Sequence, residues 1–146
     1  MTTESLRRKA LWALLIAGLI FFASSRSTIA APRSPFEFIR IDKLGHFAVY
    51  GLLGTLLCRM GTGWRSAGWA VLAASAYGVS DEWHQSFVPG RSVEVADWLA
   101  DTLGAALACS LYAGVPAYRR ALETAIGRRR VKVPPASVPA ADPVTP

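Results

Sequence analysis

Carboxylate, imidazole and amide side chains recur at helical spacing in three parts of this sequence. Residues four apart share one face of a helix. The residues with this spacing are Asp42, His46 and Tyr50, then Asp81 and Gln85 with Glu82 between them, then Asp97 and Asp101. Such groups can bind a polar ligand, hold a divalent cation or move a proton. If a metal binds, we expect Asp81, Glu82 and Asp101 to hold it; in an enzyme, His46 held by Asp42 would be the general base.

Four apolar segments must position these residues. Of the 146 residues, 52% are hydrophobic and only 18% are charged. The segments run over about 10–25, 41–60, 64–87 and 95–115, close to the roughly 20 residues of a membrane-spanning helix. Residues 10–23 have no polar face, which a soluble four-helix bundle would need. The sequence therefore predicts an all-α integral membrane bundle of four transmembrane helices.

The distribution of Lys and Arg predicts how this bundle is oriented. Most of the 16 basic residues precede the first segment, flank the turn between the second and third, or follow the fourth. Because cytoplasmic loops carry an excess of Lys and Arg, we expect residues 1–9 and the C-terminus to be cytoplasmic. The membrane domain covers 10–118, and 119–146 form a basic, then Pro-rich disordered cytoplasmic tail. A cleaved signal peptide ending near Ala30 and Ala31 is the alternative for the first segment, and it leaves the remaining topology unchanged.

The polar residues then lie at one depth, just below the outer membrane surface. A charge at lipid depth is costly, so deep acids such as Asp81 and Asp101 should face the bundle interior. Pro89-Gly90 suits a tight turn that places Arg91 over the acids as a counter-charge or an anion contact. The alternative is that Asp42 and Asp97 favour helix N-termini and Glu82 faces interfacial water. The candidate pocket residues are Asp42, Lys43, His46, Tyr50, Asp81, Glu82, Gln85, Arg91, Asp97 and Asp101.

Two other features carry less information. The net charge of +6 could indicate nucleic-acid binding, but the basic residues flank apolar segments instead of forming one stripe. We therefore expect no nucleic-acid partner. Cys58 and Cys109 each lie in an apolar run without metal-ligand spacing, which predicts two buried small hydrophobic residues.

Three stretches resemble the VanZ-like family of small bacterial membrane proteins. They are DKLGHFAVYGLLG at 42–54, SDEWHQSFVPGRS at 80–92 and DWLADTLGA at 97–105. Their patterns are D-K-x-x-H, D-E-x-x-Q-x-F-x-P-G-R and D-x-x-x-[ND]-x-x-G. Lys43 is the lysine of the first pattern. Asp101 stands where such sequences often have Asn. The resemblance implies a multi-pass protein of the bacterial plasma (inner) membrane. The family's namesake is linked to low-level resistance to the glycopeptide antibiotic teicoplanin, but the resemblance implies no settled reaction.

Three functions fit these expectations. The first is binding of a lipid, a lipid-linked cell-envelope molecule or a glycopeptide in the outer pocket, which would modulate envelope properties or antibiotic susceptibility. The second is a membrane-embedded enzyme acting on a lipid-linked substrate, with a possible divalent cation. The third is a small proton- or ion-coupled carrier, which at this size would need to oligomerise.

Overall fold

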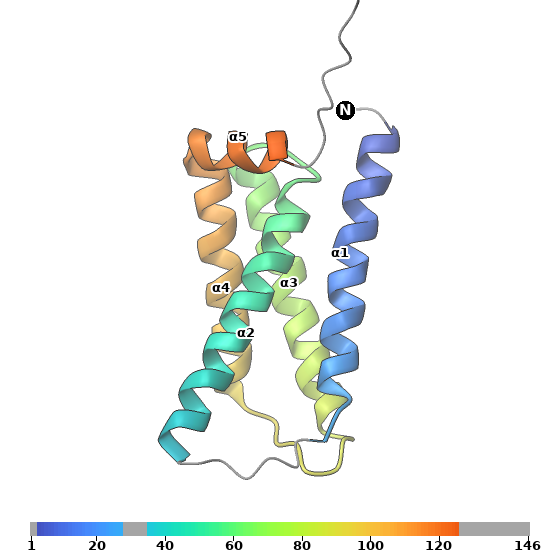
Figure 1. Cartoon of the computed structure of the whole chain (residues 1–146), viewed down its shortest axis with the longest axis vertical. Helices are drawn as coiled ribbons and strands as arrows, with labels where there is room; N and C mark the ends of the chain where they lie inside the picture. Colours follow the sequence, from blue (N-terminus) through green and yellow to red (C-terminus); the bar gives the residue numbers. More distant parts are fainter. Residues whose placement is uncertain (1–2, 28–34, 126–146) are drawn as a thin grey trace, which may run out of the picture.

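The protein is built from helices, as the computed structural model in Figure 1 shows. The structure describes residues 3–27 and 35–125. In this part of the chain the helices are α1 (Thr3–Ser24), α2 (Pro35–Cys58), α3 (Gly63–Gln85), α4 (Val95–Gly114) and α5 (Pro116–Ala125), and there is no strand. The first four lie side by side, and α5 lies across one end of them. The all-α fold class is confirmed.

The helix boundaries differ from the expected ones mainly at N-termini. Helix α1 begins at Thr3 rather than near residue 10, and α2 begins at Pro35 rather than near residue 41. The expected starts followed the apolar residues, but Lys and Arg are good helix formers, so Arg7, Arg8 and Lys9 continue α1. Proline is favourable in the first turn of a helix, which suits Pro35. Helix α3 ends at Gln85, before a turn in which Gly90 has a φ of 81°.

Helix α5 corrects the expectation that a disordered tail starts at residue 119. It follows α4 through a bend of 96°, and Glu123 holds it in place. The Glu123 carboxylate accepts from Lys9 Nζ at 3.2 Å, Arg59 Nε at 3.0 Å and the Tyr112 hydroxyl at 3.1 Å. The other predicted tail residues, 126–146, and the alternative cleavage site near Ala30 lie outside the described residues.

Small residues bring α2 and α4 into close contact. A Cβ atom on Gly104 would lie 2.1 Å from the Phe47 carbonyl oxygen, and one on Gly54 would lie 3.0 Å from the Ala105 Cα atom. The distance at Gly104 leaves no room for a side chain, and the one at Gly54 is a tight contact, so these glycines allow the close approach of the two helices. This interface fixes the positions from which the polar residues of α2 and α4 face each other.

The buried core forms two clusters. Tyr50 and Leu53 pack with Ile20 in one, and Cys58 and Cys109 belong to the other. Both cysteines are buried and free, as expected.

Length and hydropathy do not single out any one of the described helices as a membrane span. Taken together, Val95–Gly114 and Pro116–Glu123 are long and apolar enough to form one bent span.

Candidate functional site

The predicted polar residues gather at the end of the bundle opposite α5, where α1 and α3 finish and α2 and α4 begin (Figure 1). We call this the site end. The residues form two groups, one between α2 and α4 and one at the end of α3.

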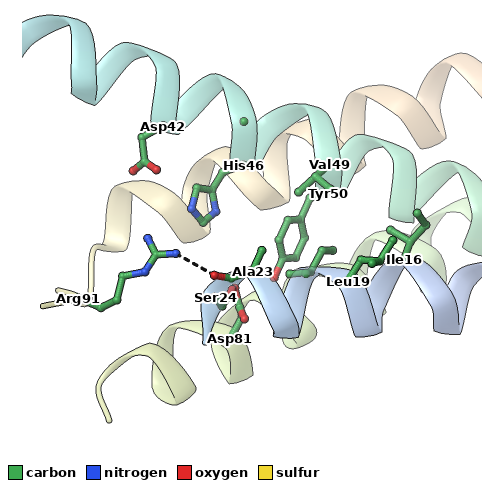
Figure 2. A pocket seen from close by; sticks show the side chains of 12 residues that line it. Ile16, Leu19, Ala23, Ser24, Asp42, His46, Val49, Tyr50, Asp81 and Arg91 are labelled. Atoms are coloured by element: carbon green, nitrogen blue, oxygen red, sulfur yellow. Dashed lines mark hydrogen bonds between the residues drawn. The ribbon is translucent and has the colours of Figure 1, made fainter. Parts of the chain in front are cut away.

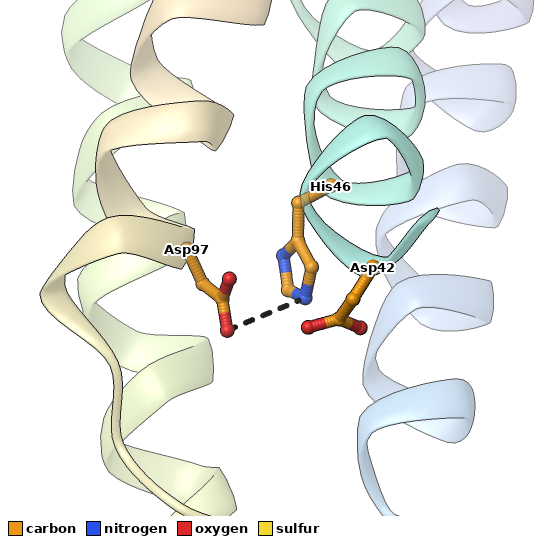
Figure 3. A group of neighbouring side chains, drawn as sticks. All are labelled: Asp42, His46 and Asp97. Carbon is orange, nitrogen blue, oxygen red and sulfur yellow. Dashed lines mark ion pairs between the residues drawn. The ribbon is translucent and has the colours of Figure 1, made fainter. Parts of the chain in front are cut away.

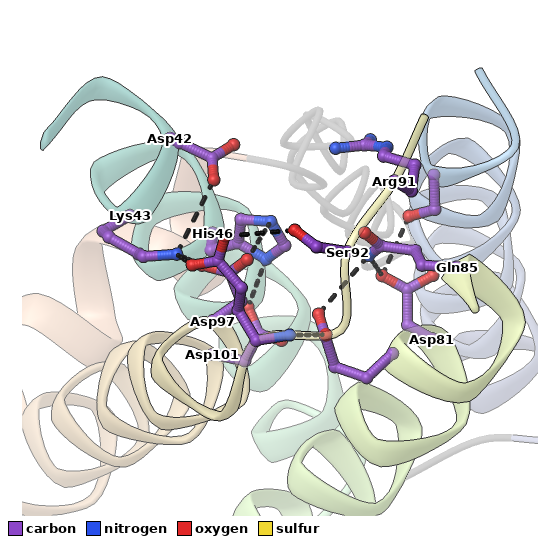
Figure 4. A network of polar contacts seen from close by, with 12 residues as sticks. Asp42, Lys43, His46, Asp81, Gln85, Arg91, Ser92, Asp97 and Asp101 are labelled. Atoms are coloured by element: carbon purple, nitrogen blue, oxygen red, sulfur yellow. Dashed lines mark hydrogen bonds and ion pairs between the residues drawn. The ribbon is translucent and has the colours of Figure 1, made fainter. Parts of the chain in front are cut away.

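His46 is the centre of the group between α2 and α4 (Figure 4). Its Nδ1 lies 2.9 Å from Asp101 Oδ1, and its Nε2 lies 3.9 Å from Asp97 Oδ2. Because an ionised carboxylate only accepts hydrogen bonds, Nδ1 donates to Asp101. Asp101 is 0% exposed, so it holds the imidazole ring with Nε2 facing Asp42 and Asp97.

Lys43 joins the acids around His46. Its ammonium pairs with Asp97, with Glu94 Oε2 at 2.5 Å and with Asp42 Oδ2 at 3.8 Å. The hydrogen bond from Lys43 lowers the pKa of Glu94 below its ordinary value. Asp97 lies in the first turn of α4, as the helix-end interpretation predicts, yet it is buried against Lys43. Lys43 thus ties α2 to the start of α4.

The second group lies on the last turns of α3. Asp81, Glu82 and Gln85 are all buried. Asp81 Oδ2 accepts from Ser24 Oγ of α1 at 2.8 Å and from Gln85 Nε2 at 3.2 Å. Glu82 Oε2 accepts from the Glu94 backbone N–H at 2.8 Å, which satisfies a donor at the start of α4. Glu82 therefore links two helices and does not face interfacial water.

Arg91 is not the counter-charge for the acids, one of the two roles expected for it. Its guanidinium donates to the Ala23 carbonyl at 3.5 Å, and within the described residues it forms no ion pair with an acid. The carbonyls at the end of α1 lack partners within the helix, and the turn at Gly90 directs Arg91 toward them. The counter-charge for the acids comes from Lys43 instead.

A cavity of about 520 Å³ lies between α1 and α2 at the site end (Figure 2). Five of the ten predicted residues line it: Asp42, His46, Tyr50, Asp81 and Arg91. The other five, Lys43, Glu82, Gln85, Asp97 and Asp101, do not. Its remaining lining is mostly apolar and is contributed by Ile16, Leu19, Ile20, Ala23, Ser24, Gly45 and Val49.

Several polar atoms of residues around this cavity are buried without a hydrogen-bond partner among the described residues. On the lining residues they are the Tyr50 hydroxyl, Asp81 Oδ1 and Arg91 Nε. Buried polar groups are normally hydrogen-bonded, so each such atom requires an explanation. Their position on one cavity indicates a place where a ligand can supply the partners.

The group with metal-ligand spacing differs from the one predicted. Asp42, His46 and Asp97 each offer an atom within 4.8 Å of the other two (Figure 3). Asp81, Glu82 and Asp101 do not form such a group in the part of the chain that the structure describes. The reason is that Asp81 turns to Ser24, Glu82 to the start of α4 and Asp101 to His46.

Two contributors to the site were not predicted. Ser24 binds Asp81 and lines the cavity, and Glu94 binds Lys43. The pair Ser24-Ser25 at the end of an apolar run is the sequence signal for the first. No spacing rule connects Glu94, which lies in the connection before α4, with Lys43.

The fold and the site together define an α-helical bundle with a buried polar network and an adjoining amphipathic cavity at one end. A sequence profile described as VanZ/LLP1 matches residues 7–116. The chain therefore belongs to the VanZ-like family, and the match includes every predicted site residue. Neither the curated proteins nor the solved structures include a significant match to this chain.

Proposed function

We propose that this protein is embedded in the bacterial inner membrane and binds a lipid or lipid-linked cell-envelope component in the cavity between α1 and α2. The observation that carries the proposal is the make-up of the cavity. Unpartnered buried polar atoms lie at one end, beside an apolar wall formed by Ile16, Leu19 and Val49. Ligand sites combine apolar walls with a few placed polar groups in this way, and an amphiphile matches both parts.

Exposed apolar side chains support the membrane location. Helices α1 to α4 have 20 to 24 residues each, which at 1.5 Å per residue gives about 30 to 36 Å, near the thickness of a hydrocarbon core. Large apolar patches on a protein surface mark contact with a partner or a membrane. The exposed large side chains include Leu11, Trp12, Leu15, Trp69, Leu72, Leu103 and Leu107.

The basic residues support an orientation with both termini in the cytoplasm. Arg7, Arg8 and Lys9 lie in the first turns of α1. Arg59 and Arg65 lie on either side of the connection between α2 and α3. All lie at the α5 end, which the positive-inside rule places in the cytoplasm. The cavity then opens at the depth of the outer leaflet, where envelope precursors and glycopeptide antibiotics are encountered. Occupancy of the cavity would thus modulate envelope properties and teicoplanin-type susceptibility.

Analysis of co-purified lipid tests this proposal. The wild-type protein, extracted in mild detergent, should retain a specific amphiphile that Asp81→Asn and Arg91→Gln lose. Arg65→Gln is the matched control, because Arg65 is exposed in the first turn of α3, at the α5 end. Expression of the wild type, but not of Arg91→Gln, should alter teicoplanin susceptibility. Equal lipid retention by all four proteins would contradict the proposal.

The geometry of His46 favours a second candidate, a membrane-embedded enzyme on the same amphiphile. Asp101 orients the ring through Nδ1, and His46 lines the cavity, so Nε2 can act as a general base. A general base contributes roughly 10²- to 10⁴-fold to a rate. Head-group release from a lipid extract, measured by mass spectrometry, should then fall by about that factor in His46→Gln. No release by the wild type, with or without added divalent cations, would leave binding as the function.

A further inference from the structure

The three unpartnered groups on the cavity differ in what they require from a ligand. Tyr50 is 0% and Asp81 is 3% exposed, so water reaches neither freely. Asp81 Oδ1 is a carboxylate oxygen and requires a donor, whereas Arg91 Nε requires an acceptor; the Tyr50 hydroxyl can serve as either. A ligand that satisfies all of them must bring both a donor and an acceptor.

The charged side chains on the cavity lead to the same requirement. Asp42 and Asp81 place two carboxylates on the lining, and Arg91 places one guanidinium there. The partners of Asp81 Oδ2 are neutral, a hydroxyl and an amide, so no cation among the described residues pairs with this carboxylate. Buried charges are normally paired. A ligand cation beside Asp81 and a ligand anion beside Arg91 would supply both pairs.

We propose, building on the proposed function, that the cavity recognises a zwitterionic lipid head group with a primary ammonium and a phosphate, as in an ethanolamine phospholipid. The ammonium donates to Asp81 Oδ1, and the phosphate accepts from Arg91. The Tyr50 hydroxyl completes the contacts, and an acyl chain follows Ile16, Leu19 and Val49. Leu19 is exposed, so the apolar side of the cavity is continuous with the outer surface of α1.

The donor requirement distinguishes this head group from its relatives. A trimethylated ammonium, as in a choline phospholipid, has the same charge but no N–H, so it leaves Asp81 Oδ1 without a hydrogen bond. A glycerol head group offers hydroxyl donors but no cation. The apolar wall distinguishes the lipid from the soluble ester glycerophosphoethanolamine, which has the same head group without chains.

Binding by the delipidated full-length protein in detergent tests the inference. Native mass spectrometry and thermal unfolding would compare phosphatidylethanolamine, phosphatidylcholine, phosphatidylglycerol and glycerophosphoethanolamine. Hydrogen bonds to charged groups are strong enough that one lost partner corresponds to about tenfold or more in affinity. We expect phosphatidylethanolamine to bind at least about tenfold more tightly than the other three. Asp81→Asn and Arg91→Gln should each remove this preference, whereas Arg65→Gln should keep it.

Tyr50→Phe separates binding from folding. The hydroxyl has no hydrogen-bond partner in the part of the chain that the structure describes, so its removal costs the ligand-free fold no hydrogen bond there. The ligand-free melting temperature should therefore stay the same or rise, while affinity for phosphatidylethanolamine falls several-fold. A fall in the ligand-free melting temperature with unchanged lipid affinity would overturn the assignment of Tyr50.

The four ligands separate this inference from the proposed function. Equal binding of phosphatidylcholine or phosphatidylglycerol would overturn the ammonium–phosphate assignment and leave lipid binding intact. If glycerophosphoethanolamine binds as tightly as phosphatidylethanolamine, the acyl chains contribute nothing. That result would overturn lipid binding but leave the assignment of the ammonium and phosphate contacts. If none of the four binds, the head-group assignment is wrong, and the co-purified amphiphile decides the proposed function.

Discussion

Asp101 is fully buried on α4, and its Oδ1 atom accepts the hydrogen bond that fixes the His46 ring. The other oxygen, Oδ2, lies against α3, where a Cβ atom on Gly78 would come within 3.1 Å of it. This single carboxylate therefore fills the space between three helices and decides where His46 Nε2 points. The enzymatic function depends on that direction.

Substitution of Asp101 should show this dependence. Asp101→Ala leaves His46 Nδ1 without its acceptor and opens a gap beside Gly78, so we expect a loss of about 1–3 kcal/mol in the free energy of unfolding. Asp101→Asn retains an acceptor oxygen at the same place and should cost about 1 kcal/mol or less. Thermal unfolding in detergent measures both. Equal stability of the alanine and asparagine variants would contradict the role of the hydrogen bond.

For single residues, the sequence predicts which side chains share a helix face but not which of them pair with one another. Spacing alone placed Asp42, His46 and Tyr50 on one helix face, and the structure has His46 and Tyr50 on the same cavity. It could not show that Lys43, and not Arg91, pairs with the acids. That choice depends on how the connection between α3 and α4 folds back toward α1, and no helical periodicity describes a turn.

Among the elements, α2 and α4 form the pair that holds the site. Their close approach at Gly104 and Gly54 allows Lys43 and His46 on one helix to reach Asp97 and Asp101 on the other. Both segments are rich in Gly and Ala, and such small residues allow helices to pack closely, as observed here. Which glycine faces which helix required the three-dimensional arrangement.

Gly104→Ala should therefore be strongly destabilising. The new Cβ atom would lie 2.1 Å from the Phe47 carbonyl oxygen, which forces the backbones apart and costs roughly 1–3 kcal/mol or more. Gly68→Ala in α3 is the matched control, because nothing lies within 4 Å of its Cβ position. It should stabilise the helix by up to about 1 kcal/mol. Melting temperatures that change equally in the two variants would contradict this account of the interface.

Helix α5 depends on one side chain at the opposite end of the molecule. Burial raises the pKa of Glu123, but hydrogen bonds from Arg59, Lys9 and Tyr112 outweigh it, so the pKa lies below its ordinary value. Tyr118 and Leu122, four residues apart, pack on the core cluster around Cys58. This spacing is the signal from which the helix could have been predicted, but the charged residues between them resemble a cytoplasmic tail.

Acid should release α5. Because the folded pKa of Glu123 is lowered, its stabilising contribution is present above the ordinary value of 4.5 and is lost as the pH falls through the folded value. Hydrogen exchange of the α5 amides should therefore accelerate as the pH falls below that ordinary value, after correction for the intrinsic rate. Glu123→Gln should show weaker protection at neutral pH and little further change in acid. An acid response in the variant as large as in the wild type would contradict this assignment.

In the whole molecule, the basic residues and the cavity lie at opposite ends. Basic residues mark the α5 end, and the cavity with its polar network lies at the site end (Figure 1). The amino-acid sequence was sufficient to predict four helices and this polarity. A pocket at this end was expected, but the wall that α1 contributes to the cavity was not, because it depends on how closely α1 packs against α2 and no sequence pattern encodes that distance.

Labelling of single cysteines tests the proposed orientation. Ser92 is exposed at the site end and Thr62 is exposed in the turn at the α5 end, while the native cysteines are buried. A membrane-impermeant maleimide should label Ser92→Cys in intact spheroplasts, and should label Thr62→Cys only after permeabilisation. The reverse pattern would place the site end in the cytoplasm and contradict the proposed access from the outer leaflet.

An experimental structure determined in lipid nanodiscs tests the central claim most directly. We predict density for an amphiphile between α1 and α2, with its polar end within hydrogen-bond distance of the Tyr50 hydroxyl, Asp81 Oδ1 and Arg91 Nε. Its chain should run along Leu19 and Val49. A structure in which α1 closes onto α2, so that the cavity disappears and protein side chains pair with those three groups, would contradict the account.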